Sequence, residues 1–96
     1  MGRRSVAEEA YQNYEENDEA DIGEGVWLML YDFKGVKPNP RFWGNLKRLT
    51  GLAGDGVMLQ YSVFSTRKRR SALAAVKIAS HYGAEVMLFQ GKIVDL

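Results

Sequence analysis

A single aspartate, Asp32, interrupts the most apolar stretch of the sequence and could hold a metal ion. It lies near the end of the run 26–33, just before a loop that contains Gly35. A carboxylate buried there without a partner would be costly, so it must reach water, a cation or a metal ion. One carboxylate alone is a poor metal site, but a dimer axis nearby would bring a second copy. The two copies would offer oxygen ligands to Mg²⁺ or Mn²⁺. The alternative is a strand-end aspartate that caps loop amides.

Four consecutive cations, residues 67–70, form the second feature with chemical potential. They stand where a helix is expected to begin, and cations there are disfavoured by the helix dipole. Phosphate binding would give them a function, whereas a solvated basic face is the alternative. A second basic group lies in the helix expected earlier in the chain. The residues predicted to bind nucleic acid are therefore Arg41, Lys47, Arg48, Arg67, Lys68, Arg69 and Arg70.

The net charge of +1 over 96 residues hides a strong asymmetry. Residues 1–25 carry eight acids and two arginines, whereas residues 26–96 carry eleven Lys and Arg and four acids. A basic domain with an acidic tail is one pattern of nucleic-acid-binding proteins, in which the tail competes or shields. A solubilising leader is the alternative. Because residues 1–25 lack a regular apolar period, we expect a flexible tail there, in which residues 5–14 could form a transient helix, and a domain over residues 26–96.

Composition excludes several other kinds of protein. The chain has no cysteine, so it has neither disulfides nor thiolate zinc sites. The longest apolar run, residues 26–33, is too short to span a membrane, and no secretory signal is recognisable. His81 is interpreted as a helix-end residue without a catalytic partner. Gly54-Asp55-Gly56 precedes a strand, which excludes a phosphate-binding glycine loop. We expect a soluble, cytoplasmic protein without membrane contact.

The elements that must position these residues follow from periodicity. Residues 26–33 alternate as a strand with two apolar faces, so both faces need cover. Asn39 and Pro40 fit the cap and first position of a helix that runs to about Leu52. A second strand is expected over 57–65, with a bend or bulge midway left open, then a helix over 67–82 with Ser65 or Thr66 as its cap, and a strand over 85–90. Gly91-Lys92 would turn the chain into a last strand, 93–96.

This order predicts an α+β fold of ferredoxin-like type, an antiparallel sheet with two helices on one face. One helix layer covers only one face of the sheet. The other face would be wet in a monomer, so we expect a homodimer that buries it.

Two segments resemble one known family. Leu30-Tyr31-Asp32-Phe33 is similar to the "Y-D-hydrophobic" motif that ends strand one in the CRISPR-associated adaptation proteins usually called "Cas two". Gln60-Tyr61-Ser62-Val63-Phe64 resembles that family's "Q-[YN]-S-V-F" motif almost letter for letter. The resemblance extends over residues 26 to about 90.

The resemblance implies a ferredoxin-like homodimer that bridges CRISPR integrase subunits and grips duplex DNA during spacer acquisition. Several members of the family are metal-dependent nucleases on RNA or DNA. Carried over to this chain, Asp32 would be the catalytic and metal-binding acid, paired with its dimer copy. Tyr31 and Phe64 would shape the site, with Gln60 and Ser62 as further motif positions, Ser62 near the same strand surface.

Three functions remain open from the sequence. The first is a DNA-bridging adaptation dimer with little or no catalysis, which is favoured because Leu59 and Ser65 replace a basic residue and a glutamate usual in the family. The second is a toxin-type ribonuclease that uses Asp32 and a divalent metal ion. The third is a ferredoxin-like regulatory domain that binds a small ligand or a protein.

Overall fold

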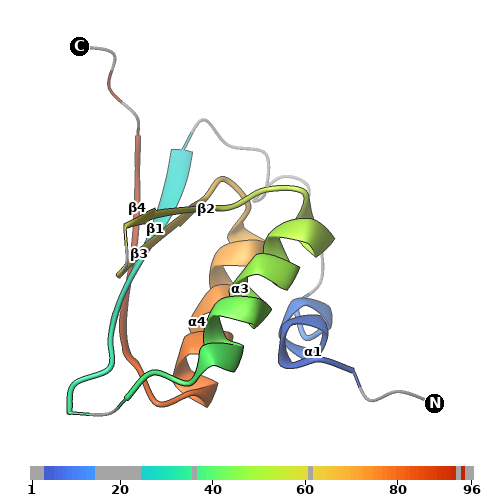
Figure 1. The fold of residues 1–96 in the computed structure, drawn as a ribbon. Helices are drawn as coiled ribbons and strands as arrows, with labels where there is room; N and C mark the ends of the chain where they lie inside the picture. The colour runs from blue at the N-terminus through green and yellow to red at the C-terminus, as the bar shows by residue number, and fades with distance from the viewer. Residues whose placement is uncertain (1–3, 15–24, 36, 61, 93, 95–96) are drawn as a thin grey trace.

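A four-stranded antiparallel sheet and three helices make up the part of the chain that the structure describes (Figure 1). The computed structural model describes residues 4–14, 25–35, 37–60, 62–92 and 94. In chain order the elements are α1 (Val6–Gln12), β1 (Gly25–Asp32), α3 (Pro40–Ala53), β2 (Val57–Gln60), β3 (Val63–Thr66), α4 (Arg69–His81) and β4 (Glu85–Lys92).

The sheet has the strand order β2-β3-β1-β4, with every neighbouring pair antiparallel. The first strand, β1, is therefore central, between β3 and β4. Helices α3 and α4 cover one face of the sheet, and α1 lies outside them (Figure 1). The α+β class and the antiparallel sheet are confirmed, and the arrangement is compatible with the ferredoxin-like type.

Helix α3 begins where the sequence predicts and ends at Ala53, one residue past the predicted Leu52. The Asn39 side chain accepts a hydrogen bond from the backbone amide of Arg41, at 3.0 Å, and Pro40 occupies the first turn. Gly54 ends the helix with φ of 71°, a left-handed conformation that favours glycine. The buried side of the helix is an apolar stripe at helical spacing: Phe42, Leu46, Leu49 and Ala53.

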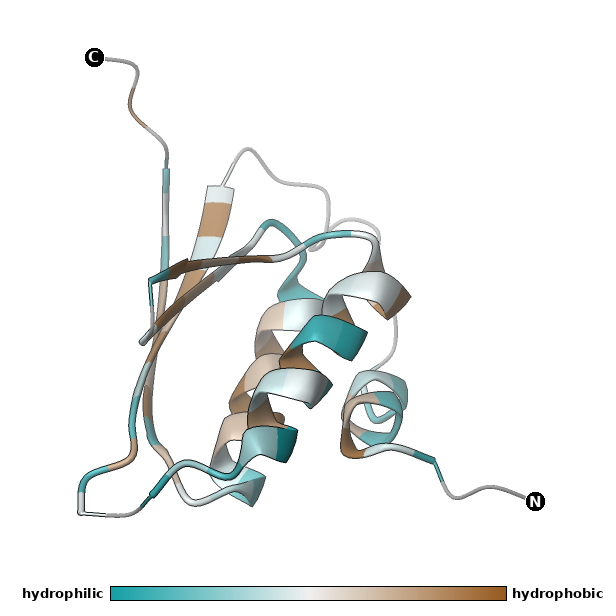
Figure 2. Cartoon of the chain, in the orientation of Figure 1, coloured by the Kyte–Doolittle hydropathy of each residue, from teal (hydrophilic) through white to brown (hydrophobic). Residues whose placement is uncertain are grey.

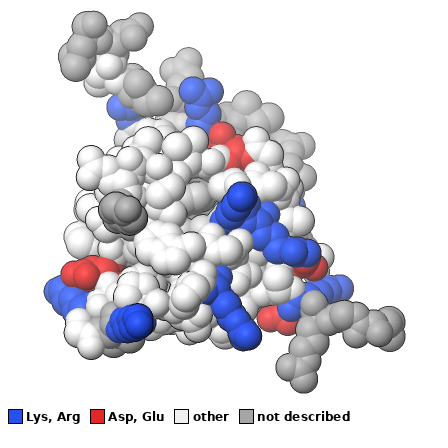
Figure 3. Space-filling model, in the orientation of Figure 1, with Lys and Arg blue, Asp and Glu red and all other residues white. Residues whose placement is uncertain are grey.

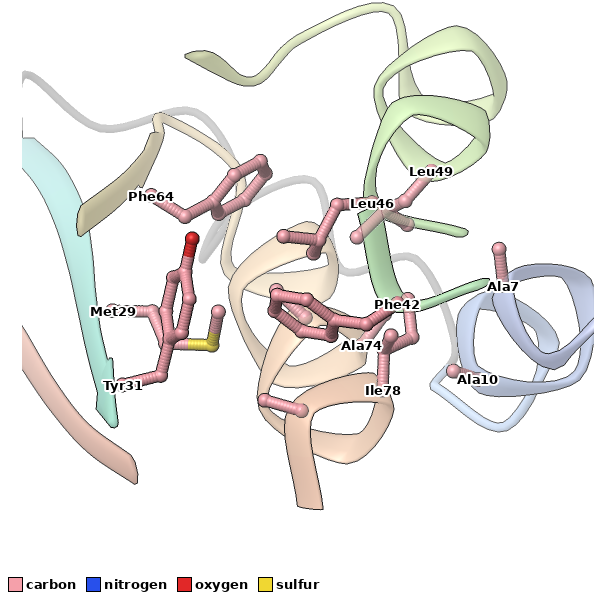
Figure 4. Packing of buried hydrophobic residues seen from close by; sticks show 12 residues of the cluster. Ala7, Ala10, Met29, Tyr31, Phe42, Leu46, Leu49, Phe64, Ala74 and Ile78 are labelled. Carbon is pink, nitrogen blue, oxygen red and sulfur yellow. The ribbon is translucent and has the colours of Figure 1, made fainter. Parts of the chain in front are cut away.

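The core lies between the sheet and α3 and α4 (Figure 4). Met29 and Tyr31 of β1 enter it from the sheet, as their alternation with Leu30 predicts, and Phe64 enters from β3. The rings of Tyr31 and Phe42 meet edge to face, with centroids 5.0 Å apart. Met29 and Tyr31 therefore tie this side of β1 into the core.

The predicted single strand over 57–65 is wrong: this segment folds into two strands. β2 and β3 pair antiparallel, with an irregularity in register between Met58 and Gln60. Val57, Val63, Phe64 and Thr66 favour strands. No Gly, Pro, Asn or Asp marks the turn, and Ser62 alone does not identify it. Tyr61 lies outside the described residues.

Two further boundaries, the start of helix α4 and the end of strand β4, also differ from the expectation. Helix α4 begins at Arg69, and its N-cap is Lys68 without a side-chain hydrogen bond, not Ser65 or Thr66. Those two residues stay in β3, where Thr66 is buried. Strand β4 continues through Gly91 and Lys92, because both pair with β1. There is thus no turn at these positions, and residues 93, 95 and 96 of the predicted last strand lie outside the described residues.

The predicted flexible tail is corrected at residues 6–12, which form helix α1. Ser5 caps this helix through its side chain, and Ala7 and Ala10 are buried in the core cluster. The small alanine side chains let the helix approach α3 and α4 closely, which an analysis based on large apolar residues misses. Residues 15–24 lie outside the described part of the chain.

Candidate nucleic-acid interface

The face of the sheet opposite the helices is apolar and uncovered in the single chain. Cross-strand register aligns two rows on it, Ser65–Leu28–Phe89 and Val63–Leu30–Met87. Phe89 is 47% exposed, Met87 59% and Leu30 37%. Hydrophobic residues follow the strands as well as the buried sides of the helices (Figure 2). Large exposed apolar surfaces of this kind mark interaction sites.

A hollow of about 570 Å³ lies at the end of this face and contains the predicted site residue Asp32. Asp32 lies directly opposite Glu85 of β4, so the two carboxylates share one face of the sheet. Lys34 binds the Glu85 carboxylate at 3.1 Å. This hydrogen bond, the Glu85 charge and then the Asp32 charge raise the pKa of Lys34. The lining residues are Leu30, Tyr31, Asp32, Lys34, Ser62, Glu85, Val86 and Met87.

The two motif segments meet at this hollow. The backbone amide of Tyr31 donates to the carbonyl of Ser62 at 3.1 Å, and both residues border the hollow. The Tyr31 side chain lies in the core, where its hydroxyl donates to the Met58 sulfur at 2.8 Å and burial raises its pKa to about 12. Phe64 is likewise a core residue, and Gln60 is exposed at the end of β2. Of the motif side chains, Asp32 and Ser62 are thus the ones available to chemistry at the hollow.

Three of the seven predicted cations make contacts within the protein. The Lys68 ammonium donates to the carbonyl of Ala53 at 2.6 Å and so caps the end of α3. Arg48 binds Glu8, and Arg70 binds Tyr11, both partners lying on α1. The other four predicted cations are exposed: Arg41, Lys47, Arg67 and Arg69.

The exposed cations lie on two neighbouring parts of the surface. Lys and Arg side chains gather over α3 on the face shown in Figure 3. Lys68 joins the start of α4 to the end of α3, so Arg67 and Arg69 extend this basic surface past the end of α3. Arg41 lies at the opposite end of α3, about 10 Å along the axis from Arg48. The seven cations therefore do not form one tight cluster.

Asp55 and His81 are excluded from the site. The Asp55 carboxylate accepts hydrogen bonds from the Thr66 hydroxyl, at 2.7 Å, and from the amide of Arg67, at 2.6 Å. It therefore holds the loop before β2 to the end of β3. His81 is exposed and packs edge to face on Tyr82. Among the described residues, no group of three or more His, Cys, Asp or Glu could hold a metal ion.

Sequence reasoning missed three residues that contact predicted site residues. Glu85 lies opposite Asp32 through strand register, which the chain order does not give. Glu8 and Tyr11 bind Arg48 and Arg70 through the packing of α1. The one available signal was the alanine spacing of residues 7 and 10, which places both on one side of a helix.

Comparison with protein-family models, with curated proteins and with solved structures gave no match for this chain. The similarity to the Cas-two family therefore rests on the two motif segments. Within the described residues, no helix has both the length and the apolar character needed to cross a membrane.

Proposed function

We propose that this chain forms a homodimer through the open sheet face and binds duplex nucleic acid, as an adaptation protein of the Cas-two type does with duplex DNA beside its integrase subunits. One observation carries the proposal: the two motif segments lie 27 or more positions apart, yet they are hydrogen-bonded at one hollow, Tyr31 to Ser62. The hollow opens at the end of the apolar face. A ferredoxin-like dimer would place two such hollows on one assembly.

The dimer is supported by the apolar rows around Leu30 and Met87, which water covers in a single chain. The test is the mass measured by light scattering at micromolar concentration. We expect a dimer for the wild type and a monomer for Met87→Glu, because a charge there would be buried without a partner. Leu52→Glu is the matched control: Leu52 is 44% exposed but lies on α3, away from the open face. A monomeric wild type, or equal masses for both variants, would contradict the sheet-face dimer.

Nucleic-acid binding is supported by the exposed cations Arg67 and Arg69, which the described part of the chain leaves without a side-chain partner. The double variant Arg67→Ala/Arg69→Ala should weaken duplex binding and flatten the logarithmic salt dependence by about 1.8, since each phosphate contact contributes about 0.9. Lys37→Ala/Lys92→Ala removes the same charge elsewhere and should leave the slope unchanged. Equal slopes for the two double variants would assign Arg67 and Arg69 to a solvated surface.

A second candidate function, metal-dependent nuclease activity, is favoured by the position of Glu85. Glu85 adds a second carboxylate opposite Asp32. Mg²⁺ sites commonly use one or two carboxylates together with water and phosphate oxygens. Asp32 and Glu85, in the hollow that Ser62 also lines, would hold Mg²⁺ or Mn²⁺, which would supply an activated water.

Two measurements separate this nuclease from the adaptor. Asp32→Asn and Glu85→Gln should each weaken Mn²⁺ binding measured by calorimetry and abolish cleavage of labelled RNA and duplex DNA. Glu9→Gln, on α1, should change neither. Cleavage that survives both a chelator and Asp32→Asn would contradict the metal site. Duplex binding without cleavage by the wild type would leave the adaptor as the function.

A further inference from the structure

Helix α1 fills the groove between α3 and α4, on the side of these helices away from the sheet (Figure 1). Ala7 and Ala10 point toward the two helices and are 0% and 1% exposed (Figure 4). The backbone amide of Ala7 donates to the Asn45 side chain of α3 at 2.9 Å. The groove is therefore a surface of the ferredoxin-like part of the chain that α1 covers.

Two cations at this groove are bound by α1. Arg48 on α3 donates to the Glu8 carboxylate, with Nε at 2.9 Å and a terminal nitrogen at 2.5 Å. Arg70 on α4 donates to the backbone carbonyl of Tyr11 at 2.9 Å, and its guanidinium lies 3.7 Å from the centre of the Tyr11 ring. A carboxylate and a carbonyl thus occupy donors of the kind that phosphates use.

Further cations lie along both sides of the groove. On α3, Arg41 lies two helical turns before Arg48, on the side that also carries Asn45. On α4, Lys77 lies two turns after Arg70 and falls on the same side of that helix. The groove under α1 is therefore flanked by two cations on each helix, and Arg and Lys are side chains that contact the phosphates of nucleic acids.

We infer that this groove is a phosphate-binding surface for duplex nucleic acid and that α1 is its intramolecular competitor. The inference rests on the proposed nucleic-acid binding. When α1 is docked, Glu8 and Tyr11 hold Arg48 and Arg70. When duplex binds, its phosphates take these two guanidiniums and α1 leaves the groove. The apparent affinity is lowered by the fraction of molecules in which α1 is docked.

The size of α1 suits a reversible competitor. A helix of seven residues is not stable by itself in water, so its structure depends on the groove. Its fully buried side chains are two alanines, with Val6, Tyr11 and Tyr14 only partly buried. Because residues 1–25 are acidic overall, the displaced segment does not compete with the cations of the groove for the phosphates of the duplex. Docking and release are thus balanced by a few weak contacts.

The test compares Glu8→Gln with Glu9→Gln in the full chain. Both changes remove one negative charge from the first turn of α1, but Glu9 is exposed and its side chain makes no ion pair among the described residues. Binding to a fluorescent duplex DNA is measured by anisotropy at low salt. We expect Glu8→Gln to bind about two- to five-fold more tightly than Glu9→Gln, the effect of one ion pair lost from the docked state. Hydrogen exchange of the wild type should show that the amides of residues 9–12 lose protection when duplex is added.

The outcomes separate the competitor from the binding itself. Equal affinities for the two variants would overturn the role of α1 as a competitor. Any effect of the tail on binding would then be general charge repulsion. Unchanged protection of α1 in the complex would also overturn it, because the groove would remain filled. No duplex binding by the wild type or either variant would overturn the proposed function, and the competitor with it.

Discussion

Asp32 and Glu85 are direct partners across the β1–β4 pair, at the end of the sheet where both motif segments meet. Like charges in this position repel, and Lys34 reduces the repulsion by binding Glu85. Two carboxylates therefore stand together on one open face of the sheet, where their mutual repulsion opposes strand pairing.

The first prediction concerns the energy of that pair. Asp32→Asn should raise the free energy of unfolding more in the wild type than in a Glu85→Gln background, by about 0.2–1 kcal/mol at low salt. Chemical denaturation of the four proteins of this double-mutant cycle measures the difference. Equal gains in both backgrounds would show that the two carboxylates do not interact.

The burial of Tyr31 predicts how the stability of the protein changes at alkaline pH. Burial raises its pKa from 10.0 to about 12, so the folded state holds the phenolic proton more tightly than the unfolded state does. The contribution of Tyr31 to stability is complete below pH 10 and is lost as the pH rises from 10 to about 12. Denaturation at stepped pH, with tyrosinate absorbance, measures this. Tyr31→Phe should remove that part of the pH dependence, and an identical profile for Tyr31→Phe would contradict it.

Ser71 predicts a stabilising substitution. Its side chain is fully buried in α4, and its hydroxyl has no hydrogen-bond partner among the described residues. Ser71→Ala should raise the free energy of unfolding by about 1–2 kcal/mol, because the desolvated hydroxyl is removed. Ser80→Ala in the same helix is exposed and should give only the gain in helix propensity, at most about 0.5 kcal/mol. A loss of stability in Ser71→Ala would mean that the hydroxyl has a partner.

Alanine substitution at two glycines, Gly51 inside α3 and Gly56 just after it, should change the stability of the protein in opposite directions. Gly51 lies inside α3 with open space around its missing side chain, so Gly51→Ala should stabilise by about 0.5–1 kcal/mol. Gly56 has φ of 138°, and a Cβ there would lie 2.8 Å from the Phe64 ring and 2.8 Å from the Thr50 methyl group. Gly56→Ala should therefore lower the melting temperature. Thermal unfolding of both variants tests the pair, and a stable Gly56→Ala protein would contradict the packing around Phe64.

The sequence alone determined the features that depend on residues close together in the chain. Asn39, Pro40 and Gly54 set both ends of α3 through local hydrogen bonds and backbone conformation. Alternation along β1 correctly placed Met29 and Tyr31 on one face and Leu30 and Asp32 on the other, because successive side chains of a strand point to opposite sides. The α+β class followed from these elements.

Tertiary structure decided what depends on contacts between distant segments. The turn between β2 and β3 lacks the Gly, Pro, Asn or Asp that usually marks a turn. It is therefore recognised from the pairing of the two strands. Register, a property of two strands together, brought Glu85 opposite Asp32. Helix α1 is too short and too weakly apolar to be predicted as packed, and it forms because α3 and α4 offer a groove with Asn45, Arg48 and Arg70 at its sides.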